Sequence, residues 1–144
     1  MLLGRYYSKI SKKGRIALPS KFRKELGEKI ILSRWYEGCL VVVGITQWNL
    51  LVNRFAKREE VFIKPIRSVE RFILCSAYEI DIDNQGRFVI PESLRSVARL
   101  DNEIIFLGLG ERVEIWDQKS WLMEENRVID EADKMLMQLS KSRK

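Results

Sequence analysis

Apolar and polar positions alternate along this chain in short runs that are typical of β-strands. Eight segments have such an alternating pattern or a continuously apolar one: residues 5–10, 15–18, 29–34, 39–43, 79–83, 87–90, 103–107 and 112–116. Strict alternation is typical of a half-buried strand, and a continuous apolar run is typical of a strand buried on both faces. Turn-forming residues at 37–38 and 108–111 predict that the last two strands of each half form a hairpin.

Other segments place apolar side chains at helical spacing. Short helices are predicted at 20–26 and 92–98, because Pro19 and Pro91 precede them and proline suits the first turn of a helix. Longer helices are predicted at 46–60, 68–77 and 118–139, with a break at 61–65 and a frayed end from residue 140. Strands and helices together predict an α+β protein.

The chain contains an internal repeat. Residues 14–23 align without a gap on residues 86–95, with four identical pairs: Gly14 and Gly86, Arg15 and Arg87, Pro19 and Pro91, and Arg23 and Arg95. Four short strands bury little and expose their edges, so we expect the two copies to pack together as one pseudo-symmetric unit. The predicted organisation is a first repeat at 5–50, a helical connector at 51–76, a second repeat at 77–123, and a C-terminal helix with a frayed tail at 124–144.

The charge of the chain is uneven. It carries 26 Lys and Arg against 20 Asp and Glu, a formal net charge of +6. Residues 1–72 hold 16 of these cations and 6 anions (net +10), whereas residues 73–144 hold 10 and 14 (net −4). The N-terminal half is therefore expected to face a polyanion, although a solvated basic face is the simpler alternative.

Composition excludes several kinds of chemistry. The chain has no histidine, which excludes His-dependent catalytic triads and His-ligated zinc. Cys39 and Cys75 lie in apolar runs, and we expect both to be buried, reduced thiols of a cytoplasmic protein. No apolar run approaches the ~18 residues of a membrane span, so we expect a soluble protein without a membrane partner. We also expect no enzymatic activity, no small-molecule substrate and no cofactor.

The candidate functional residues lie at the glycine turn of each repeat. In the first copy, Lys12, Lys13, Gly14 and Arg15 form a basic turn, flanked by Arg5 and Lys9. Lysine suits phosphate oxygens, and arginine can also donate two hydrogen bonds to guanine. Arg15 is therefore predicted to read bases, and the lysines are predicted to contact phosphate.

The second copy offers the turn Asn84, Gln85, Gly86 and Arg87. Its two amides could read adenine or contact the nucleic-acid backbone. Arg87 stands at the position of Arg15 and is likewise predicted to read bases. An alternative interpretation is that each arginine pairs with a nearby carboxylate and only fixes its turn. For Arg87 the available partners are Asp83 and Asp81.

A calcium loop is a rival interpretation of the second turn. Asp81, Asp83, Gln85 and Glu92 have a spacing close to that of an EF-hand loop. The repeat argues against it, because the first copy places Lys9, Ser11, Lys13 and Ser20 at the equivalent positions. We therefore expect no metal site.

Each copy contains, in order, a Gly-Arg turn, an apolar strand, a Pro-x-x-hydrophobic-Arg segment, a hairpin and a Trp-bearing helix. This repeated order of motifs resembles the MraZ family, which belongs to the AbrB-like swapped-hairpin superfamily of bacterial transcription regulators. The resemblance covers residues 1 to about 125. It implies a double-wing swapped-hairpin β-barrel built from two AbrB-like repeats in one chain, with peripheral helices. It also implies a nucleoid-associated protein whose subunits assemble into a ring and bind short direct repeats of double-stranded DNA upstream of the division and cell-wall gene cluster.

The family's DNA-contacting turns correspond to residues 11–15 and 83–87. Ser11 replaces the usual aspartate of the first turn. This departure predicts a less acidic turn with a stronger attraction for phosphate.

Two other classes of function stay open. One is an antitoxin-like interaction protein, although such proteins more usually combine a single copy with a toxin-binding tail. The other is a non-specific nucleoid or RNA-binding module. RNA binding is disfavoured because Tyr6 and Tyr7 are adjacent on a strand and so face opposite sides, which does not suit base stacking.

Overall fold

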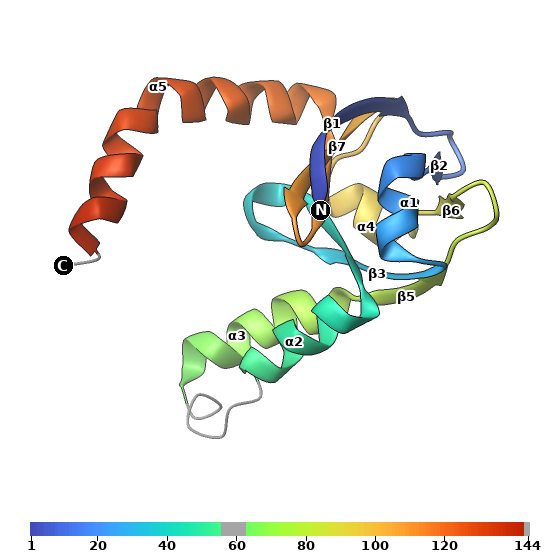
Figure 1. Cartoon of the computed structure of the whole chain (residues 1–144), viewed down its shortest axis with the longest axis horizontal. Helices are drawn as coiled ribbons and strands as arrows, with labels where there is room; N and C mark the ends of the chain where they lie inside the picture. The colour runs from blue at the N-terminus through green and yellow to red at the C-terminus, as the bar shows by residue number, and fades with distance from the viewer. Residues whose placement is uncertain (56–62, 143–144) are drawn as a thin grey trace.

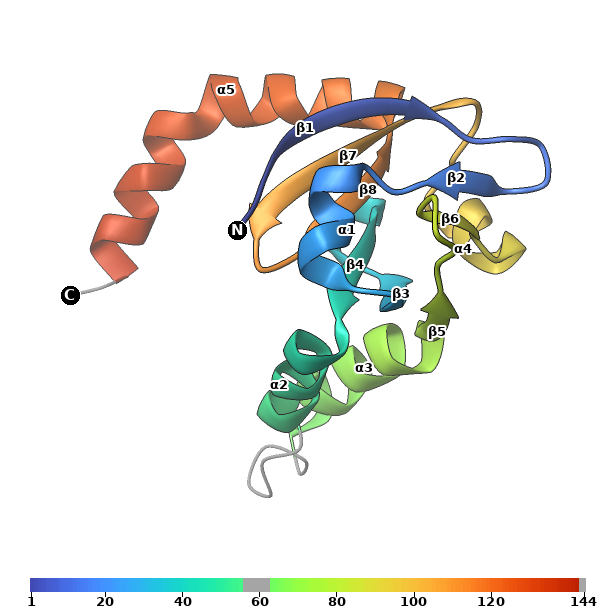
Figure 2. The same ribbon diagram turned by 45° about the vertical axis from the view of Figure 1, so that its right-hand side comes forward.

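The strands form one large antiparallel sheet and one small ribbon (Figures 1 and 2). This computed structural model describes residues 1–55 and 63–142, with only the backbone described for Phe55. The large sheet has the order β1 (Leu2–Lys9), β7 (Glu103–Gly110), β8 (Val113–Asp117), β4 (Leu40–Gly44), β3 (Lys29–Arg34) and β5 (Tyr78–Asp81). The ribbon pairs β2 (Arg15–Ala17) with β6 (Arg87–Val89).

The two repeats complete each other's sheets. β1 pairs with β7 of the second repeat along its whole length, from Leu2 opposite Gly110 to Lys9 opposite Glu103. In the same way β5 of the second repeat pairs with β3 of the first, and β2 pairs with β6. Among the described strands, only the later ones of each repeat, β3 with β4 and β7 with β8, form hairpins within their own copy. The expected packing of the two copies into one unit is therefore confirmed.

The α+β class is confirmed, but the predicted barrel is not. The large sheet is open, with β1 and β5 as its edges, and no closed barrel exists among the residues that the structure describes. The reason is that β2 and β6 pair only with each other instead of bridging the two edges.

The helices largely follow the prediction. The structure has α1 (Ser20–Leu26), α2 (Ile45–Phe55), α3 (Lys64–Ile73), α4 (Glu92–Val97) and α5 (Gln118–Ser142), with short 3-10 turns at Tyr36–Gly38 and Leu74–Ser76. α3 begins at Lys64 and not at residue 68, because Pro65 occupies its first turn instead of breaking the helix. Residues 56–60 of the helix predicted at 46–60 lie outside the described residues. α5 continues to Ser142, so the expected fraying was wrong for residues 140–142, and residues 143–144 lie outside the described residues.

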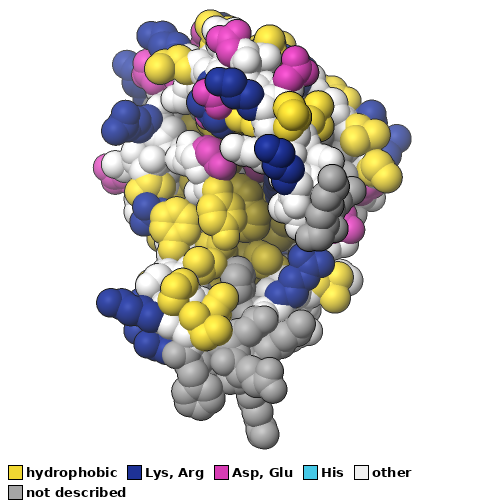
Figure 3. Space-filling view, turned by 90° about the vertical axis from the view of Figure 1, so that its left-hand side faces the viewer, with side chains coloured by type: hydrophobic (Ala, Val, Ile, Leu, Met, Phe, Trp, Pro, Cys, Tyr) yellow, Lys and Arg dark blue, Asp and Glu magenta, His cyan; other side chains and the backbone are white. Residues whose placement is uncertain are grey.

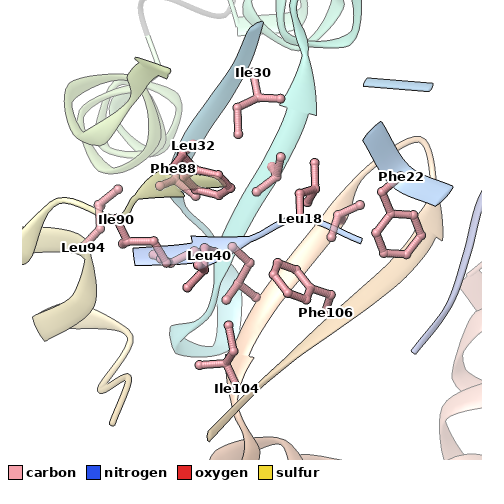
Figure 4. Packing of buried hydrophobic residues seen from close by; sticks show 14 of the residues in the cluster. Leu18, Phe22, Ile30, Leu32, Leu40, Phe88, Ile90, Leu94, Ile104 and Phe106 are labelled. Atoms are coloured by element: carbon pink, nitrogen blue, oxygen red, sulfur yellow. The ribbon is translucent and has the colours of Figure 1, made fainter. Parts of the chain in front are cut away.

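Both repeats supply the main core. Its side chains come from equivalent places in the two copies and interdigitate in the interior (Figure 4): Leu18, Phe22, Ile30, Leu32, Leu40, Phe88, Ile90, Leu94, Ile104 and Phe106. Such a core cannot form from one copy alone, because the partner strands and all the buried side chains of the other copy would be missing. Trp48 of α2 packs on a smaller cluster of Ile31, Val41 and Val43.

The cysteines differ from expectation in one respect. Both are free thiols, and Cys39 is buried as predicted. Cys75 is exposed, because the 3-10 turn Leu74–Ser76 carries it to the surface and only Ile73 of that apolar run is fully buried. Burial raises the pKa of the Cys39 thiol, and the nearby Glu114 carboxylate raises it further.

Helix α5 and the apolar surface beside it lie away from the ribbon. α5 extends from the body, none of its residues is buried, and Ile129, Leu136 and Leu139 are exposed. On the adjoining face, hydrophobic side chains gather in a hollow (Figure 3). A cavity of about 130 Å³ beside α2 is lined in part by Trp35, Val43 and Leu51.

Candidate nucleic-acid interface

The first turn joins β1 to β2 and closes on Ser11. The Gly14 amide donates a hydrogen bond to the Ser11 carbonyl (2.9 Å), and the Ser11 amide donates to the Arg15 carbonyl (3.1 Å). The Ser11 hydroxyl accepts from the Arg15 amide (3.0 Å). Gly14 has a φ of +83°, a conformation that disfavours any residue with a Cβ. The turn therefore exposes Lys12, Lys13 and Arg15 on a fixed backbone.

The second turn has the same backbone hydrogen bonds. The Gly86 amide donates to the Asp83 carbonyl (2.9 Å), and the Asp83 amide donates to the Arg87 carbonyl (3.1 Å). The Asp83 carboxylate accepts from the Gln85 amide (2.9 Å), the Arg87 amide (2.8 Å) and Arg87 Nε (2.7 Å). The bonds from the Arg87 amide and guanidinium lower the pKa of Asp83 to about 2. Ser11 thus closes the first turn with fewer side-chain bonds than Asp83 makes in the second.

Arg15 and Arg87 lie on the same two-stranded ribbon. Arg15 stands opposite Val89 and Arg87 opposite Ala17, and both arginines line a groove of about 320 Å³. The structure therefore brings the two predicted base-reading residues together on one face.

The two arginines differ in their partners. The alternative in which Arg87 pairs with a carboxylate is realised here through Asp83. No ion pair of Arg15 is found within residues 1–55 and 63–142. The Arg15 guanidinium is thus available to an external anion without first giving up a salt bridge.

The remaining candidates divide into two groups. Asn84 and Gln85 are exposed at the tip of the second turn, as Lys12 and Lys13 are at the first. Arg5 is held elsewhere, because it forms an ion pair with Glu125 of α5 (2.7 Å) and lies over the Trp121 ring. Lys9, the last residue of β1, is exposed beside a groove that also contains Asp101.

The sequence analysis did not identify Arg23 and Arg95 as residues that contact these turns. Arg23 Nη1 donates to the Asn84 carbonyl (3.0 Å), and Arg95 Nη1 donates to the Lys12 carbonyl (3.1 Å). Each arginine therefore reaches from a helix of one repeat to the turn of the other. Their identity in the repeat alignment was the available signal, but nothing in the sequence indicated the crossing.

The structure also bears on the rival interpretations. Within the described part of the chain, no group of three or more acidic or cysteine side chains could hold a metal ion, and the Asp83 carboxylate is engaged by Arg87. Tyr6 packs edge-on against Phe22 while Tyr7 is 64% exposed, so the two rings face opposite sides as expected. None of the described helices is long and apolar enough to cross a membrane.

These features define a class of two-repeat α+β proteins in which exchanged strands present a pair of equivalent Gly-Arg turns. The family model described as "MraZ protein, putative antitoxin-like" matches residues 1–72 and again residues 73–136. The chain belongs to the MraZ family, which confirms the resemblance in the sequence.

Several relatives share most of this chain. The protein named "Transcriptional regulator MraZ" of Caldanaerobacter subterraneus subsp. tengcongensis is 40% identical over 121 residues, which cover 84% of each chain. The protein of the same name from Caldicellulosiruptor bescii is 39% identical over 133 residues, 90% of this chain and 92% of its own. That of Acetivibrio thermocellus is 38% identical over 122 residues, 84% of each chain.

Proposed function

We propose that this chain is a transcriptional regulator that binds specific DNA through its two Gly-Arg turns and performs no catalysis. The observation that carries the proposal is the placement of Arg15 and Arg87 on one ribbon, each at a turn whose tip is exposed. The name shared by the relatives supports a regulatory role. The protein would act in the cytoplasm, on the nucleoid.

The two turns have different parts in this proposal. Lys12 and Lys13 are exposed cations that suit phosphate oxygens, and Arg15 can present its guanidinium to a base edge. Arg87 reaches DNA either together with Asp83 or after leaving it, so its contribution to affinity is smaller. The first turn is therefore the stronger contact.

We further propose that the target is a set of short direct repeats upstream of the division and cell-wall gene cluster, bound by a ring of subunits. One pair of turns contacts few phosphates and binds weakly, whereas several subunits on repeated sites gain affinity through effective concentration. A basic N-terminal half and an acidic C-terminal half favour head-to-tail contacts, which close into rings when the rotation permits. The exchange of β1, β2 and β5 between the repeats supports the swapped-hairpin assignment.

Binding of labelled DNA fragments tests the proposal. A fragment with spaced direct repeats from that upstream region should be shifted, and a fragment with one repeat should not. Arg15→Ala should sharply reduce specific binding, and Arg87→Ala should reduce it less. Lys134→Ala on α5 removes the same charge at the far end of the molecule and serves as the control.

The outcomes separate the alternatives. Retained affinity in the Arg15→Ala variant contradicts the role of the turn. Equal binding of unrelated DNA or RNA favours a non-specific module, and no binding of any nucleic acid contradicts the proposed function. Native mass spectrometry tests the ring, which predicts one discrete assembly instead of a monomer.

A further inference from the structure

Arg23 and Arg95 form the same contact twice, once in each direction between the repeats. Arg23 extends from α1 of the first repeat to the carbonyl of Asn84 in the second turn. Arg95 extends from α4 of the second repeat to the carbonyl of Lys12 in the first turn. Each guanidinium lies in the wall of a groove between a turn and the opposite helix, of about 330 Å³ for Arg23 and about 580 Å³ for Arg95. The two contacts are related by the pseudo-symmetry of the repeat.

Each arginine also packs directly on the glycine of the turn that it reaches. A Cβ added at Gly14 would lie 2.7 Å from Arg95 Nε, and one added at Gly86 would lie 2.8 Å from Arg23 Nε. Both Nε atoms are buried and make no hydrogen bond within the described residues. The glycines are therefore required for two reasons, namely their positive φ and the close approach of the guanidinium.

The backbone connects these contacts to the ribbon. The Gly14 carbonyl accepts from the Ile90 amide (2.8 Å), and the Gly86 carbonyl accepts from the Leu18 amide (2.9 Å). Each turn is thus held to the other repeat by two hydrogen bonds. One comes from an arginine guanidinium to a carbonyl at the tip of the turn, and the other comes from the amide that follows the opposite ribbon strand to the glycine carbonyl.

We infer that Arg23 and Arg95 are positioning residues that each hold the other repeat's turn in the conformation that contacts DNA. This inference rests on the proposed function for its consequence in DNA binding, but the positioning itself is a property of the free protein. It means that neither turn is set by its own repeat alone.

The two turns should depend on their arginines to different degrees. The Asp83 carboxylate makes three hydrogen bonds within the second turn, whereas the Ser11 hydroxyl makes one in the first. The first turn therefore has less internal support and relies more on Arg95 than the second turn relies on Arg23.

Amide hydrogen exchange of the free, full-length protein tests the positioning. Arg95→Ala should accelerate exchange about tenfold in the first turn and leave the second within about twofold, because a charged hydrogen bond is lost on one side only. Arg23→Ala should accelerate exchange only in the second turn, by a few-fold. Lys24→Ala, at the exposed neighbour of Arg23 on α1, should change neither turn.

Two further variants separate positioning from general stability. Arg95→Lys retains a cation that can donate to the Lys12 carbonyl, so it should recover part of the protection. Ser11→Asp in the Arg95→Ala background should recover more, because an aspartate there can accept the bonds that Asp83 accepts in the second turn. Melting temperatures of all variants show whether a change is global.

The inference is overturned if Arg95→Ala accelerates exchange in its own repeat, in both turns equally, or in neither. DNA binding is then measured separately on the same variants. Crossed loss of protection with unchanged DNA affinity would keep the positioning role and contradict the role of the turns in DNA binding. Crossed loss together with weaker binding, greater for Arg95→Ala than for Arg23→Ala, supports both.

Discussion

Replacing Gly14 by alanine adds one methyl group where the first turn meets the second repeat. Gly14 has a φ of +83°, and the new Cβ would lie 2.7 Å from Arg95 Nε and 2.8 Å from the Ile90 carbonyl oxygen. A contact below 3.0 Å requires a neighbour to move, and this carbonyl belongs to Ile90, whose amide donates to the Gly14 carbonyl between the two repeats. The substitution should therefore destabilise the turn and its attachment together.

The loss of stability has two sources of known size. A left-handed backbone conformation costs a residue with a Cβ roughly 1–2 kcal/mol. Overpacking against neighbours that must shift costs typically ~1–3 kcal/mol. We therefore expect Gly14→Ala to lower the free energy of unfolding by about 2–5 kcal/mol.

Gly38 provides the matched control. Its φ is +79°, but no heavy atom lies within 4 Å of the position of an added Cβ. Gly38→Ala therefore carries the conformational cost alone, about 1–2 kcal/mol. The difference between the two variants isolates the close approach of the two repeats at Gly14.

Urea unfolding followed by the fluorescence of the four tryptophans measures both variants. Protein concentrations must be matched, because self-association shifts the apparent stability. Equal losses in Gly14→Ala and Gly38→Ala would refute the close approach. In an Arg95→Ala background the cost of Gly14→Ala should fall only in part, because the Ile90 carbonyl remains in place.

Three further outcomes can be measured. Lys12→Ala and Lys13→Ala should each lower the slope of log K against log salt for DNA binding by about 1 unit, and unchanged slopes would exclude phosphate contacts. Because the pKa of Asp83 falls from 3.8 to about 2 on folding, its support of the second turn should be complete above pH 4 and disappear as the pH drops through 2. Amide exchange against pH checks this, and Asp83→Asn should abolish the dependence. A thiol reagent should modify exposed Cys75 in the native protein but buried Cys39 only on unfolding, and Cys75→Ser should remove the fast phase.

Local structure was largely predictable from the sequence. The turns at Gly14 and Gly86 and the helices after Pro19 and Pro91 follow from short-range preferences, and the structure has all of them. The repeat itself indicated that Arg15 and Arg87 are equivalent. These features depend on residues close to one another in the chain, which is why pattern and spacing sufficed.

The pairing between the repeats was not predictable in the same way. Periodicity shows that residues 5–10 form a strand, but not that this strand pairs with β7. The contacts of Arg23 and Arg95 depend on that exchange, so they were hidden as well. The early start of α3 at Lys64 and the exposure of Cys75 depend on how Pro65 and the following 3-10 turn are placed, which composition alone does not decide.

The pairing of β1 with β7 has a consequence for the order of events during synthesis. β1 is synthesised well before β7, yet β7, its only partner in the described sheet, ends at Gly110. At roughly 5–20 residues per second, β1 waits on the order of 5–20 s for the strand that completes it. During that interval Leu2, which is buried in the finished protein, has no core to join. The nascent chain must therefore keep β1 unpaired until β7 has been made.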